Sequence, residues 1–121
     1  MDSFFGTANA RKYSSALHGR LVLTKSVWRH VVEGHGEFVR LNANLIKPTL
    51  ADPCEIRQSQ HPKDKDTYVY YSQPKELYRK ENVTVPAMGL QFAVVVDAAQ
   101  GRIKTIYIAR TRIPGKVVYQ K

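Results

Sequence analysis

The stretch FAVVVDAAQGRIKTIYIARTR at residues 92–112 decides the fold. Its opening run, residues 92–96, is almost continuously apolar, which is typical of a central strand covered on both sides. Residues 98–101 read Ala-Ala-Gln-Gly and favour a tight turn. The remainder, residues 102–112, alternates between apolar and polar side chains, as a strand with one buried face does. The stretch therefore predicts two strands joined by a turn.

Two more strands are predicted upstream of this stretch. Residues 54–60 alternate in the same way, and residues 67–72 (Thr-Tyr-Val-Tyr-Tyr-Ser) are rich in β-forming side chains. The segment 73–88 contains two prolines and several charges, and it predicts a long connection. Residues 116–120 can add a terminal strand.

Helical periodicity marks the preceding part of the chain. A first helix is expected to begin at an N-cap, either Thr24 or Ser26, and to end or kink at Gly34 and Gly36. Its buried stripe comprises side chains at helical spacing, namely Val27, Trp28, Val31 and Val32.

A second helical pattern begins near Glu37, and Pro48 is expected to terminate or bend its last turn. Leu21-Val22-Leu23 predicts an edge strand. Residues 1–19 show no sustained period and predict a loosely ordered arm or a short helix. Helices followed by strands predict an α+β fold, with a single domain at residues 20–121.

The net charge is the strongest compositional signal. Nineteen lysines and arginines against ten acidic residues give 121 residues a charge of +9 and a pI near 9.9. A folded domain that basic usually meets a polyanion, and we expect RNA. Charge that serves solubility alone is the alternative, and no basic membrane-surface helix or bilayer span is predicted. The single cysteine, Cys54, excludes an intramolecular disulfide.

Strand alternation predicts an open sheet face that carries polar side chains. If Ile56, Ile106 and Ile108 point into the helices, other side chains of the same strands must point away from them. These are Arg57, Ser59, Thr105 and Tyr107, joined by one side of the tyrosine-rich strand, either Tyr68 with Tyr70 or Tyr71. Such a face suits single-stranded RNA. Solvent-facing strands also carry these residue types without any ligand.

The histidines do not predict a metal site. His30 and His35 would lie about 140° apart on an unbroken helix, and no zinc-binding spacing is present. His30 is either a surface residue of the first helix or a general acid or base. No cofactor is expected, because there is no glycine-rich phosphate loop. Metal-free RNA cleavage stays open, since it needs only a base, cations and a hydrogen-bond donor.

The run LTKSVWRHVVEGHGE at residues 23–37 resembles the opening of phage- and toxin-associated nucleases of the barnase–EndoU–colicin–RelE (BECR) superfamily. Later motifs follow in the same order, at residues 46–59, at Tyr70-Tyr71, and in the strands at 92–96 and 103–107. The likeness runs from about residue 20 to 112. Many relatives have His-Pro-Glu where this chain has His35-Gly36-Glu37, so the turn after the first helix can differ.

The resemblance implies two helices packed on a twisted four-stranded antiparallel sheet, and a metal-independent ribonuclease that acts as a toxin. Such an enzyme cleaves RNA by attack of the 2′-hydroxyl on the phosphodiester. It would act in the bacterial cytoplasm, alone or as part of a larger delivered toxin, with an acidic antitoxin or immunity protein as partner. A non-catalytic RNA-binding or protein-interaction module on the same fold is the alternative, and the oligomeric state is not predicted.

We assign the expected roles residue by residue. His30 would be the general acid or base and His35 an orienting or second proton-transfer group, while Arg57 would stabilise the phosphorane charge. Ser59, Tyr71 and Thr105 would hydrogen-bond the scissile phosphate or position a base. The expected RNA-binding residues are Lys104, Tyr107, Arg110 and Arg112.

Overall fold

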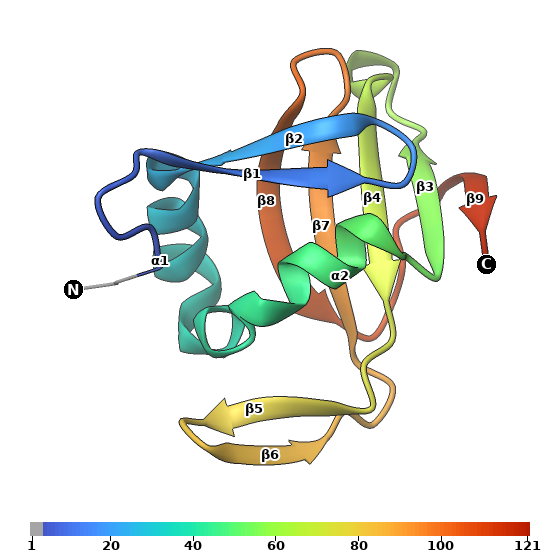
Figure 1. Ribbon diagram of the computed structural model, residues 1–121. Coiled ribbons are helices and arrows are strands. Elements are labelled where there is room, and N and C mark those ends of the chain that lie inside the picture. Colours follow the sequence, from blue (N-terminus) through green and yellow to red (C-terminus); the bar gives the residue numbers. More distant parts are fainter. Residues whose placement is uncertain (1–3) are drawn as a thin grey trace.

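The computed structural model describes residues 4–121 and contains two sheets (Figure 1). The larger is a seven-stranded sheet in the order β1-β2-β8-β7-β4-β3-β9, and the smaller is a hairpin of β5 and β6. The strands are β1 (Ala10–Ser15), β2 (Gly19–Thr24), β3 (Glu55–Ser59), β4 (Thr67–Ser72), β5 (Glu76–Lys80), β6 (Val83–Pro86), β7 (Gln91–Asp97), β8 (Arg102–Ala109) and β9 (Gly115–Gln120). The helices are α1 (Lys25–Leu41) and α2 (Ile46–Ala51), with 3₁₀ turns at Ala43–Leu45 and Pro62–Asp64.

The predicted architecture of two helices on a four-stranded antiparallel sheet is wrong. The four expected strands do lie side by side as β8, β7, β4 and β3, but β9 extends the sheet beyond β3 and the β1–β2 hairpin extends it beyond β8. Since β2 runs parallel to β8, the sheet is mixed, and the described chain is mostly β. Of the added strands, β9 was expected at residues 116–120, whereas β1 has a single buried side chain and therefore carries only a weak alternation signal.

The N-terminal segment is a hairpin where residues 1–19 were expected to be an arm or a short helix. In β1 only Tyr13 is buried, so no apolar period marks this strand. Gly19 adopts a φ of 66° at the turn into β2, a conformation that glycine takes without strain. The strand β2 is paired on both sides, to β1 and β8, and is not the edge strand that was expected. Residues 1–3 of the predicted arm lie outside the described residues.

The start and the kink of the first helix are confirmed. Thr24 is the N-cap of α1, and its hydroxyl accepts a hydrogen bond of 3.2 Å from the Val27 N–H. Gly36 has φ 75° and ψ −168°, which breaks the helical path between the two halves of α1. The second helical pattern ends at Leu41. The predicted stop at Pro48 is wrong, because Pro48 lies in the first turn of α2, where a missing N–H costs no helical hydrogen bond.

The segment 73–88, expected to be a long connection, forms the β5–β6 hairpin. Its only fully covered strand side chain is Leu77, which explains the weak sequence signal. Asn42, at the end of α1, holds this hairpin to the body of the protein. Its amide donates to the Tyr78 carbonyl at 2.9 Å and to the Phe38 carbonyl at 2.9 Å, and its carbonyl accepts from the Tyr78 N–H at 2.8 Å.

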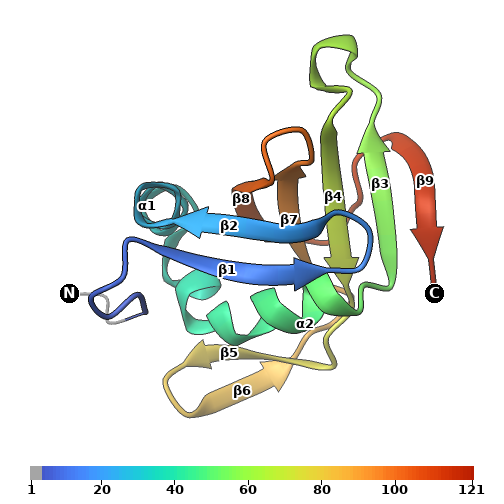
Figure 2. The same ribbon diagram turned by 45° about the horizontal axis from the view of Figure 1, so that its top comes forward.

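The β1–β2 hairpin joins β8 only at the pair Val22–Arg102 and crosses over the central strands on the side of α1 and α2 (Figures 1 and 2). The main core lies between these three elements and the central strands. The predicted inward side chains are confirmed here, since Ile56 and Ile106 are buried in this core and Ile108 packs against it. Ile103 also points inward, three residues before Ile106. A β-bulge makes this possible. Val95 pairs with Thr105 and Val96 with Ile103, so Lys104 has no partner on β7 and the alternation of β8 shifts by one residue there.

Asn42→Ala should lower the free energy of unfolding by about 2 kcal/mol, because it removes the hydrogen bonds that tie the β5–β6 hairpin to α1. Urea unfolding of the variant and the parent protein measures this difference. Asn44→Ala is the matched control, since Asn44 is exposed two residues away. Equal stability of the two variants would contradict the anchoring role of Asn42.

Candidate nucleic-acid interface on the open sheet face

The strand register places two rows of side chains across the open face, the side of the sheet opposite the main core. The first row runs Glu55, Tyr71, Ala93, Tyr107 across β3, β4, β7 and β8. The second row lies beside it and runs Arg57, Val69, Val95, Thr105 across the same strands. The four strands thus bring one carboxylate, one guanidinium and three hydroxyls to the same side of the sheet, where Glu55 and Tyr71 are buried.

The tyrosine that faces this surface is Tyr71, which resolves the choice left open by the sequence. Tyr70 is buried in the main core and Tyr68 packs against it, whereas Tyr71 lies with Val69 and Ala93 in a small cluster on the open face. Ala93 separates Tyr71 from Tyr107 in the first row. Because its side chain is a single methyl group, the two phenol oxygens approach to 3.5 Å above it.

The loop after β8 folds back onto the open face and adds a second guanidinium. Ile113 packs against the small cluster, and its N–H donates to the Tyr71 hydroxyl at 2.9 Å. Arg112 then lies with its guanidinium carbon 5.4 Å from the centre of the Tyr71 ring. Its Nε donates to the Gln91 amide oxygen at 2.5 Å, and Gln91 is itself almost fully buried.

Two arginines share one buried carboxylate at this point. The Glu55 side chain is only 4% exposed, and its Oε2 accepts from Arg57 Nε at 2.7 Å and from Arg112 Nη1 at 2.9 Å. Arg57 also donates to the Ile113 carbonyl at 2.9 Å. Two positive charges against one negative charge leave a surplus of one. We call Glu55, Arg57, Tyr71, Tyr107 and Arg112 the arginine–tyrosine cluster.

Tyr107 is a hydrogen-bond donor at neutral pH. Burial raises the pKa of Tyr107 far above its usual value of 10, and the hydrogen bond and charge of Tyr71 raise it further. The phenol therefore keeps its proton. It can donate to an anion held at the neighbouring guanidiniums, but it cannot serve as a base there.

The other predicted RNA-binding residues are placed around the cluster. Thr105 is half-buried in the second row, and Lys104 is exposed and donates to the Thr67 hydroxyl at 3.2 Å. Ser59 lies at the end of β3, where its hydroxyl accepts from the His61 N–H at 3.2 Å. Arg110 does not join the cluster, since its guanidinium donates to the Met88 carbonyl.

The structure does not bring the predicted proton-transfer group His30 to the arginine–tyrosine cluster. His30 is exposed on α1, and α1 packs through Trp28 and Val31 into the main core on the other side of the sheet. The His35 backbone lies in α1 beside the kink at Gly36, and its side chain lies outside the described part of the structure. The catalytic roles of both histidines stay predictions.

Two residues with well-defined contacts were not among the predicted site residues, namely Glu55 and His18. Glu55 precedes Arg57 by two residues in an alternating strand, so their shared face was a usable signal. His18 gave no such signal, because its partners follow some 50 residues later. Its Nδ1 lies 2.6 Å from the Tyr70 hydroxyl and its ring lies 4.2 Å from that of Tyr68, while burial lowers its pKa. This contact fixes the tip of the β1–β2 hairpin over the core.

Two features are absent from the part of the chain that the structure describes. The described side chains include no group of three or more histidine, cysteine or acidic residues placed to hold a metal ion. None of the described helices has the length and apolar character required to cross a membrane.

Comparison of the chain with protein-family models, with curated proteins and with solved structures gave no match. The resemblance to the BECR nucleases therefore stays a prediction.

Glu55→Ala should destabilise the fold by about 3 kcal/mol, because it leaves two partly buried guanidiniums without their carboxylate. Urea unfolding measures the loss. Asp52→Ala is the matched control, since the Asp52–Lys121 ion pair is exposed and should contribute little. A Glu55→Ala protein that is as stable as the control would show that the carboxylate does not hold the two arginines.

Proposed function

We propose that this protein binds single-stranded RNA on the open face, with phosphate groups at the arginine–tyrosine cluster. One observation carries the proposal. Arg57 and Arg112 both pair with the Glu55 carboxylate, which leaves one net positive charge beside it. Guanidinium pairs bind phosphate oxygens through several N–H donors at once. The side chains of Arg57 and Arg112 are 26% and 20% exposed, so a ligand can reach them.

The surroundings of the cluster support an extended ligand. Arg102 and Lys104 are exposed at the start of β8 and can contact neighbouring phosphates, and Thr105 and Tyr107 farther along the strand offer a hydroxyl and a ring. The net charge of +9 favours association with any polyanion. An acidic protein partner of the kind that the sequence predicts would compete for this basic face.

Metal-independent RNA cleavage is the second candidate, and the same geometry favours it. Cleavage by 2′-hydroxyl attack creates a phosphorane whose extra negative charge must be stabilised. The guanidiniums of Arg57 and Arg112 and the protonated phenol of Tyr107 are donors of the required type at a single point. Among the described side chains, neither candidate base is suited to this role, because Glu55 is buried between two arginines and His30 lies on the other side of the sheet. Binding is therefore proposed first.

Lys104→Gln should weaken binding of a fluorescent oligouridylate several-fold at low salt and reduce the salt dependence by about one phosphate contact. Fluorescence anisotropy at several salt concentrations measures both quantities. Arg79→Gln is the control, since Arg79 is an exposed cation of the β5–β6 hairpin away from the open face. Equal losses in both variants, or no RNA affinity in the parent protein, would overturn the proposal.

Gel analysis of the same RNA in EDTA separates the two candidates. Cleavage products from the parent protein that are absent with folded Arg57→Gln would establish the ribonuclease, and intact RNA would leave binding alone. Folded His30→Ala should keep the RNA affinity of the parent protein, because His30 lies on the other side of the sheet, and its effect on cleavage tests the predicted proton-transfer role.

A further inference from the structure

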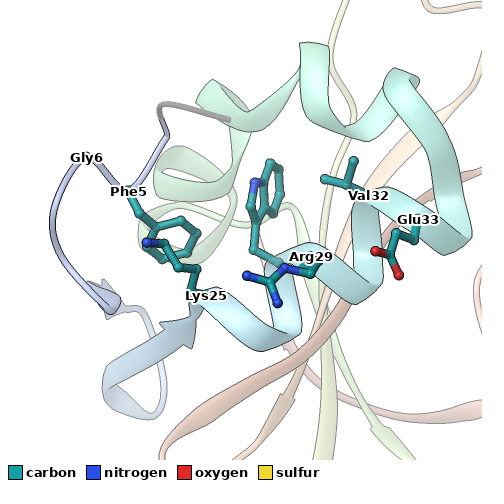
Figure 3. Close-up of a pocket in the computed structure, with 7 residues that line it drawn as sticks. Phe5, Gly6, Lys25, Arg29, Val32 and Glu33 are labelled. Carbon is teal, nitrogen blue, oxygen red and sulfur yellow. The ribbon is translucent and has the colours of Figure 1, made fainter. Parts of the chain in front are cut away.

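A cavity of about 390 Å³ lies between the N-terminal segment and the beginning of α1 (Figure 3). Phe5 and Gly6 form one wall, and the first three turns of α1 form the other. This cavity belongs to the helix side of the protein and shares no residue with the arginine–tyrosine cluster. It is therefore a second site, whose occupancy does not depend on the proposed RNA binding.

The apolar wall of the cavity is aromatic and fixed in place. Phe5 and Trp28 are buried, and Phe4 holds both of them, with its ring centre 5.3 Å from that of Phe5 and 4.7 Å from that of Trp28. The Arg11 guanidinium packs over the outer side of Phe4 at 4.0 Å. Such a wall keeps its shape without a ligand, which reduces the entropic cost of binding.

The polar rim of the cavity carries two cations. Lys25 and Arg29 are one helical turn apart and border the aromatic wall, and Glu33 follows one turn later at the far end (Figure 3). Among the ion pairs of residues 4–121, none involves Lys25 or Arg29. Lys25 is also the first residue of α1, where the helix dipole adds to the positive potential.

We infer that this cavity binds a small molecule with a planar aromatic ring and one anionic group. The ring fits the wall of Phe5, Trp28 and Val32, and the anionic group fits Lys25 and Arg29. A cavity of about 390 Å³ accommodates one or two fused rings with a short substituent, and not a folded peptide. Nucleoside monophosphates and aromatic sulfonates or carboxylates share this chemistry.

Trp28 makes the inference directly measurable. It is the only tryptophan in the sequence, so the protein has a single indole N–H resonance. We would titrate the ¹⁵N-labelled full chain with two matched pairs of probes: adenosine 5′-monophosphate against adenosine, and naphthalene-2-sulfonate against 2-naphthol. The anion of at least one pair should shift the indole resonance saturably and bind about tenfold more tightly than its neutral partner. The pair that responds identifies the source of the ligand.

Arg29→Gln should weaken binding of the anion about tenfold and leave binding of the neutral probe unchanged. Arg20→Gln, at an exposed arginine of β2 outside the cavity, is the control and should change neither. A circular dichroism spectrum confirms that both variants fold, and Lys25→Gln provides a second variant of the rim. An indole resonance unmoved by both anions, equal affinity for anion and neutral partner, or insensitivity to both rim substitutions would overturn the inference.

Discussion

Side-chain alternation along β4, β7 and β8 is the constraint on which the rest of the structure depends. A shift of one residue in any of these strands would exchange its two faces. A slip in β4 would turn the Tyr71 hydroxyl toward α1 and α2, and a slip in β8 would bury Thr105 and Tyr107 and expose Ile106. The β-bulge at Lys104 makes this constraint compatible with the sequence of β8, because Ile103 and Ile106 could not both face the core without it.

The open face combines a charged cluster with close packing. A buried carboxylate is costly unless it is paired and hydrogen-bonded, and Glu55 meets both conditions through Arg57 and Arg112. The loop after β8 is held to the same place by Tyr71 and Ile113. These contacts hold the cluster together without a ligand, and the proposed phosphate recognition by fixed donors requires such an arrangement.

The sequence predicted the centre of the sheet better than its edges. The strands β3, β4, β7, β8 and β9, the cap at Thr24 and the kink at Gly36 were predicted, because apolar alternation and glycine act locally. The strand β1 and the β5–β6 hairpin were missed, since each buries one strand side chain, Tyr13 or Leu77, and depends on partners remote in sequence.

Only the part of the candidate site that depends on local alternation was predicted. Alternation within one strand placed Arg57, Thr105 and Tyr107 on one face. It could not choose among the tyrosines of β4, where tyrosine occurs on both faces, and it could not place α1 relative to the sheet. The distance between His30 and the open face is set by tertiary packing alone, which no local pattern contains.

The most direct test is to locate bound RNA by NMR, with a 2′-O-methyl oligouridylate that lacks the attacking hydroxyl. We expect the largest shift changes at open-face positions of β3 and β8, among them Arg57, Thr105 and Tyr107. Changes concentrated on α1 around His30, with the open face unaffected, would contradict the account.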